Sequence, residues 1–97
     1  MRVMLRAHLD IQASNDAIKS GKLPQILETL TERVKPEAAY FNLNEGVRSF
    51  IMVFDLQDSA DLVAINEPLF AELGAMVEVQ PVMNREDLQK GLAALQR

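Results

Sequence analysis

The sequence predicts a single α+β domain over residues 1–97, in which helices cover one face of a four-stranded antiparallel sheet. A chain of 97 residues is too short for two cores, since each would have only about 50 residues. Its composition, 48% hydrophobic and 25% charged, is that of a folded globular protein. Its apolar residues recur alternately with the periods of strands and of helices, and this alternation predicts the order β-α-β-β-α-β.

The first strand and the first helix are expected within residues 2–35. Residues 2–10 alternate between apolar and polar side chains, which is the pattern of a half-buried strand. A helical pattern follows from Ser14, with an interruption at Gly21 and with Pro24 where a first-turn proline is tolerated. Pro36 ends this helix, because the residue before a proline is disfavoured in the helical conformation.

A hairpin is expected next. Residues 38–43 and 47–56 have strand character, and residues 44–46, Asn-Glu-Gly, have the chemistry of a turn. The second of these strands is apolar on both alternating sets of positions. It is therefore expected to lie centrally, with both of its faces covered.

The last third of the chain predicts a helix, a strand and a short terminal helix. Asp58-Ser59 can cap a helix that Pro68 divides and Gly74 ends. Residues 76–83 alternate as a strand, which Pro81 places at an edge or at its own end, because proline has no N–H to donate. Residues 84–87 form a capped start for a terminal helix.

This element order is that of the ferredoxin-like fold. Right-handed crossovers place both main helices on one face of the sheet and give the spatial strand order 4-1-3-2. The opposite face, called the open face below, has no helix to cover it. It remains for solvent, a ligand or a partner.

Alternation along each strand predicts which side chains lie on the open face. The apolar set of the first strand is expected under the helices, and on the third strand Ile51 and Val53 are assigned to the helix side. The side chains then assigned to the open face are Met4, Arg6, His8, Tyr40, Asn42, Phe50, Met52, Phe54, Met76, Glu78 and Gln80. An apolar surface of this size exceeds what a monomer usually exposes, which predicts a homodimer formed through the open faces.

Five stretches carry a resemblance to known proteins. They are Leu23-Pro24, Val34 to Phe41, Phe54 to Asp58, Glu67 to Phe70 and Val82 to Asn84. Through them the chain resembles uncharacterised small bacterial proteins of the dimeric α/β-barrel type, some of which are loosely labelled as pantothenate-synthesis proteins. The resemblance implies a dimeric barrel. It does not imply the ligase activity, which needs an ATP site: Gly21-Lys22 is followed by Leu23, and Asp16 stands where a phosphate loop needs glycine.

Composition excludes several classes of function. The chain has no cysteine, which removes thiolate catalysis and cysteine-ligated metals, and with one histidine we expect no metal site and no cofactor. A net charge of −4 with scattered basic residues argues against a nucleic-acid partner. No apolar run suits a membrane span or a signal peptide, so we expect a cytoplasmic protein with no membrane partner.

The candidate catalytic residues are His8 and Tyr40. His8 is the only side chain whose ordinary pKa lies near neutrality; the alternative is that it forms a hydrogen bond inside the dimer. Tyr40 is the only tyrosine, and cofactor-independent oxygenases of the barrel type use tyrosine with histidine to position an acidic substrate. The four serines have no neighbouring histidine in the sequence, so serine hydrolysis has no support.

Five further residues are candidates for ligand binding. They are Arg6, Phe50, Met52, Phe54 and Glu78. Arg6 either binds an anion or forms an ion pair with Glu78 on the adjacent strand, and the apolar members either line a ligand site or form the core of an interface.

Two functional hypotheses follow. In one, the protein is either a small binding protein for an acidic or aromatic metabolite or a cofactor-independent enzyme of the monooxygenase or isomerase type, with its pocket either inside the barrel or between the sheet and the helices. In the other, it is a non-catalytic homodimerising module, structural or regulatory, whose open face is filled by its partner.

Overall fold

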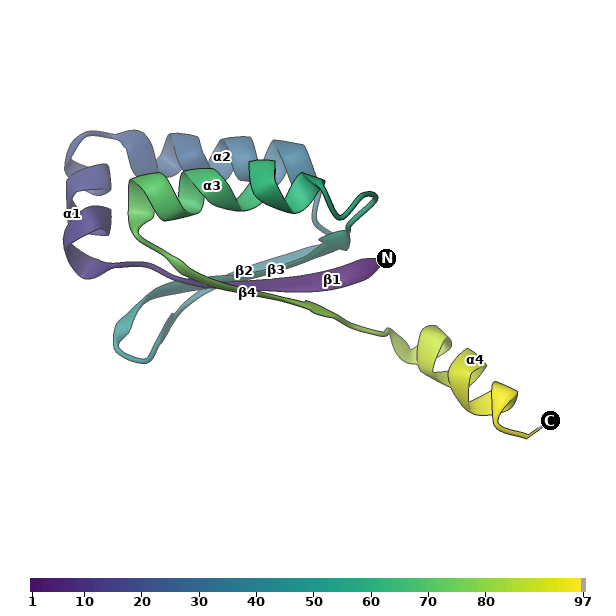
Figure 1. Cartoon of the computed structure of the whole chain (residues 1–97). Helices are drawn as coiled ribbons and strands as arrows, with labels where there is room; N and C mark the ends of the chain where they lie inside the picture. The colour runs from purple at the N-terminus through teal and green to yellow at the C-terminus, as the bar shows by residue number, and fades with distance from the viewer. Residues whose placement is uncertain (97) are drawn as a thin grey trace.

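The structure, a computed structural model, describes residues 1–96. Its elements are β1 (Arg2–His8), α1 (Ile11–Lys19), α2 (Lys22–Val34), β2 (Ala38–Asn44), β3 (Val47–Asp55), α3 (Asp61–Leu73), β4 (Met76–Pro81) and α4 (Arg85–Ala94). All three strand pairs are antiparallel and the sheet order is β2-β3-β1-β4, which is the predicted 4-1-3-2 order seen from the other edge. Helices α1, α2 and α3 lie on one side of the sheet (Figure 1). The ferredoxin-like α+β fold is thus confirmed.

The first helical segment forms two helices, and it begins earlier than expected. Helix α1 starts at Ile11, because the carboxylate of Asp10 accepts a hydrogen bond from the backbone N–H of Ala13 at 2.9 Å and so caps the helix. The expected start at Ser14 is therefore wrong. Gly21, with φ of 76°, separates α1 from α2, and Pro24 lies in the first turn of α2.

The hairpin has the expected position and a tight turn. Glu45 and Gly46 have φ values of 55° and 79°, so both turn residues are left-handed, as the twist of a two-residue hairpin favours. Helix α3 ends at Gly74, as predicted, but it runs unbroken through Pro68. The expected division there is wrong: buried Ile65 and Leu69 hold the helix against the sheet on both sides of the proline, and this packing overrides the local preference.

The core lies between the sheet and the helices. The register pairs Val3 with Phe54, Leu5 with Met52 and Ala7 with Phe50. Residues directly opposite one another share a face, so Phe50, Met52 and Phe54 lie under the helices, each no more than 2% exposed.

The predicted face assignment on β3 is therefore wrong. Ile51 and Val53 are half-buried on the open face, where Phe50, Met52 and Phe54 were expected. Both sets of positions on this strand are apolar, so alternation alone could not choose between them. The register with β1 decides the assignment.

Helix α4 stands apart from the rest of the molecule. It projects from the end of β4 (Figure 1), and none of its residues is buried. Asn84 caps it, as expected, and exchanges two hydrogen bonds with Asp87. Over residues 1–96, none of the helices is both long enough and apolar enough to cross a membrane.

Candidate functional site

The open face carries two adjacent rows of side chains that run across all four strands. One row consists of Glu78, Arg6, Ile51 and Tyr40, and the next consists of Met76, His8, Ser49 and Asn42. Opposed residues within a row have Cβ atoms about 4.5–5.5 Å apart. Strand pairing therefore gathers Arg6, Glu78 and Tyr40 in one row and places His8 beside them in the next.

His8 is the last residue of β1 and is only 7% exposed, although it lies on the face without helices. Figure 1 shows that the turn between β2 and β3 bends to the side of the sheet opposite the helices, next to the end of β1. The buried Nε2 atom of His8 has no hydrogen-bond partner within residues 1–96. A buried polar atom without a partner costs about 1–3 kcal/mol, so this nitrogen is an unsatisfied group that the described chain leaves at the end of β1.

Arg6 is half-buried, two residues before His8 on the same strand. Its Nε atom is buried and likewise has no hydrogen-bond partner in the described chain. Glu78 lies directly opposite on β4, as predicted, but no ion pair joins the two side chains among residues 1–96. The guanidinium thus keeps its donors free for an acceptor such as a carboxylate.

Tyr40 lies on the open face, as predicted, but at its rim. It is 69% exposed on the edge strand β2 and is separated from β1 by β3. Two strand spacings put it about 10 Å across the sheet from Arg6, and His8 lies in the other row. A single chain therefore does not form the pairing of Tyr40 with His8 that the sequence suggested.

Ser49 is a site residue that the sequence analysis missed. It is buried opposite His8 in the register of β1 and β3, although the two residues are far apart in the sequence. Its hydroxyl donates to the carbonyl of Val47 at 3.0 Å. Because this hydroxyl is engaged and His8 Nε2 has no partner, the two are not arranged as a nucleophile and its base. Only the strand register, a long-range property, could have revealed their proximity.

Phe50, Met52 and Phe54 do not contribute to the open face. They were expected there as ligand-binding residues, but they are part of the core beneath the helices. The apolar surface around Arg6 consists instead of Met4, Ile51 and Val53, all half-buried, and of exposed Met76. The open face remains apolar, although it is less aromatic than the sequence suggested.

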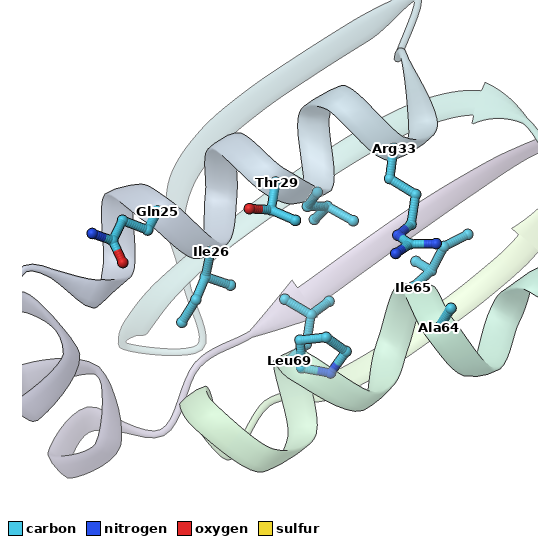
Figure 2. A pocket seen from close by; sticks show the side chains of 9 residues that line it. Gln25, Ile26, Thr29, Arg33, Ala64, Ile65 and Leu69 are labelled. Carbon is cyan, nitrogen blue, oxygen red and sulfur yellow. The ribbon is translucent and has the colours of Figure 1, made fainter.

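A hollow lies on the other side of the molecule, between α2 and α3. It has a volume of about 250 Å³, and its apolar lining includes Ile26, Ile65 and Leu69. Figure 2 shows Arg33 reaching from α2 towards Ile65 and Ala64 of α3. The polar side chains of its lining, Gln25, Thr29 and Arg33, include no general base. This groove is suited to binding an apolar group but not to proton transfer.

The two faces thus offer different chemistry. The open face combines a cation, the only histidine and an apolar floor, whereas the groove between the helices is mostly apolar, with Gln25, Thr29 and Arg33 as its polar side chains. Within residues 1–96, no three histidine, aspartate or glutamate side chains lie together in a way that could hold a metal ion.

Comparison with known proteins gives no functional assignment. No protein-family model matches the chain, and no curated protein is similar to it. The chain is similar in structure to the de novo designed protein Ferredog-Diesel, with 13% identity, a TM-score of 0.48 and coverage of 84% of this chain and 85% of the design. It is also similar to protein Atu4242 from Agrobacterium tumefaciens, with 10% identity, a TM-score of 0.41 and coverage of 88% and 96%. At these TM-scores, the fold assignment depends on the topology of the chain itself.

Proposed function

We propose that the protein is a homodimer that binds a small organic acid on its open face, with Arg6 and His8 as the polar contacts. The observation that carries this proposal is the presence of two buried nitrogens without partners, Arg6 Nε and His8 Nε2, two residues apart on the central strand β1. Folded chains rarely leave such atoms unsatisfied. A ligand that accepts hydrogen bonds from both would satisfy them.

The chemistry of Arg6 favours an acid. Its guanidinium is charged at every physiological pH and presents several N–H groups in one plane, which matches the two oxygens of a carboxylate. His8 follows on the same face of β1, about 7 Å further along. An acid whose carbon skeleton or aromatic ring spans this distance would lie over Ile51, which is opposite Arg6.

The second subunit would exclude water from this site. The open face of one chain leaves Tyr40 and Met76 more than 60% exposed, next to half-buried Met4, Ile51 and Val53. Two such faces packed against each other would bury these side chains and strengthen the interaction between the arginine and the acid, because charges attract more strongly away from water. In the enclosed site, His8 would be the base that takes a proton from a carbon of the bound acid and returns it at another carbon in an isomerisation, whereas a monooxygenation would also need molecular oxygen as a second substrate.

The second candidate function is that of a non-catalytic dimerising module. The exposed apolar side chains of the open face favour it, since they would form a dry interface without any ligand. The two candidates differ in the interior of the dimer. An enclosed cavity of about 300 Å³ or more beside Arg6 and His8 supports binding, whereas an interior filled by side chains supports the module.

A titration followed by NMR tests the binding proposal. We expect benzoate, as an aromatic acid, to shift the Nε–H signal of Arg6, and benzamide, its neutral analogue, to leave that signal in place. Arg48 is an internal control, because its Nη1 atom already donates to Ser14 Oγ at 2.6 Å. Arg6→Gln should weaken benzoate binding about 10-fold or more, since it removes a charge-assisted contact.

The binding proposal would be overturned if neither benzoate nor the aliphatic probe succinate moved the Arg6 signal at concentrations up to tens of millimolar. Equal shifts with benzoate and benzamide would also contradict it, because the carboxylate would then have no specific partner.

A further inference from the structure

The described chain exposes more surface than a folded protein of its mass should. Its accessible surface is 6699 Å², against about 5,600 Å² expected for a compact monomer of 10.9 kDa. Its radius of gyration is 15.5 Å, whereas a compact domain of this length has about 12.5 Å. The excess, about 1,100 Å², is somewhat more than the roughly 800 Å² that each partner buries in a standard protein interface.

Helix α4 accounts for the elongated shape (Figure 1) and has an apolar stripe of which no residue is buried. Leu88, Leu92 and Leu95 follow one another at helical spacing and are 46%, 51% and 79% exposed. Lys90 lies on the opposite side of the helix. An amphipathic helix of this kind is stable in water mainly when its apolar stripe packs against something.

Exposed ionic contacts join the start of α4 to β1. Arg2, the first residue of β1, donates from Nη1 to Asp87 at 2.7 Å and from Nε to Glu37, and these contacts raise the pKa of its guanidinium, the bond to Glu37 most of all. Asp87 also forms the capping box with Asn84. Figure 1 shows that α4 points to the side of the sheet opposite α2 and α3, which is the side of the open face.

We propose that α4 is a clamp, which packs its stripe of Leu88, Leu92 and Leu95 against a second copy of this chain. A copy stacked on the open face would lie on the side towards which α4 points, and two-fold symmetry would give it a clamp of its own. The apolar stripe and the apolar open face would then form one continuous interface. This inference rests on the second copy invoked in the proposed function, but not on a ligand.

The excess area and the charges favour a second copy over other occupants. A single two-fold symmetric interface would bury the excess accessible surface of both chains. An anionic membrane surface is a poorer partner, because the chain has a net charge of −4 and the first turn of α4, which begins at Arg85, contains the two acids Glu86 and Asp87.

Sedimentation equilibrium of the full chain tests the clamp. The wild-type chain should be a dimer. The double variant Leu88→Glu/Leu92→Glu should raise the dimer dissociation constant at least about 100-fold, because each α4 loses two leucines that the interface would bury. Lys90→Glu is the matched control: it lies on the same helix, changes the net charge by the same amount and should leave the dimer intact. Circular dichroism should show both variants folded, since no residue of the stripe is buried in its own chain.

Two outcomes would overturn the clamp. If the double variant dimerised as tightly as the wild type, α4 would not be part of the interface, while the binding of benzoate at Arg6 could still be observed. If the wild-type chain were monomeric at millimolar concentration, or bound instead to phosphatidylglycerol vesicles through the leucines, the second copy would be excluded as the occupant. The Arg6 titration reports on the ligand separately in each case.

Discussion

The two faces of the sheet are built from the same strands but satisfy their side chains differently. On the helix side, Leu5 and Met52 are paired across β1 and β3 and are fully buried within one chain. On the open face, their sequence neighbours Arg6 and Ile51 are also paired, but both stay half-buried, and the Nε atom of Arg6 has no hydrogen-bond partner among residues 1–96. The helix side is thus packed within a single chain, although one buried oxygen there, Asn66 Oδ1 of α3, lacks a hydrogen-bond partner among residues 1–96. On the open face, two buried nitrogens lack one, those of Arg6 and His8.

Two arginines, Arg48 and Arg6, differ in the same way in their hydrogen-bond partners. Arg48 donates to the hydroxyl of Ser14, a fully buried residue of α1, and so ties the sheet to the helix layer. Arg6 keeps a buried nitrogen without an acceptor. Arg48 therefore contributes to the fold, while Arg6 is available for function at some cost in stability.

The largest expected effect is a difference in the free energy of unfolding between variants at two neighbouring residues of β3 that lie on opposite faces. Met52→Ala should lower the free energy of unfolding by about 2–5 kcal/mol, because it leaves a cavity in the core. Ile51→Ala should cost about 1 kcal/mol, because its side chain is only half-buried. Urea denaturation of both variants, in the Leu88→Glu/Leu92→Glu background that we expect to be monomeric, measures the difference. Equal losses would contradict the assignment of the two faces.

A smaller effect is expected at the contact between the sheet and α1. Ser14→Ala should lower the free energy of unfolding by about 1–2 kcal/mol, because Arg48 loses a buried acceptor. Ser20→Ala is the control: Ser20 is exposed, and its hydroxyl donates only to the carbonyl of Ala17 in the same helix. Chemical denaturation should show a change of a few tenths of a kcal/mol for this control. If the two variants lost the same stability, the contact between Arg48 and Ser14 would not hold the layers together.

Local patterns were enough to predict most of the fold. The alternation of β1, the turn before β3 and the caps at Gly74 and Asn84 are short-range signals, and together they imply the observed strand order. The start of α1 was misplaced because Asp10 was assigned to the preceding strand although its carboxylate caps the helix. The unbroken helix at Pro68 depends on packing against the sheet, which no local signal contains.

The candidate site was predictable only in part. Alternation correctly put Arg6, His8 and Glu78 on one face, because strands β1 and β4 each have one clearly apolar side. It failed on β3, where both sides are apolar. The absence of an ion pair between Arg6 and Glu78, and the position of Ser49 opposite His8, depend on side-chain geometry and on long-range register, so the sequence could not provide them.

The most direct test of the contrast between the faces is the stability of Arg6→Met, measured by thermal and urea unfolding with and without benzoate. Methionine keeps much of the apolar stem and removes the unpartnered nitrogen. We expect the free energy of unfolding to stay unchanged or to rise by up to about 1 kcal/mol, and the stabilisation by benzoate to disappear. A loss of more than about 1 kcal/mol, with stabilisation by benzoate retained, would show that Arg6 serves the fold and not a ligand.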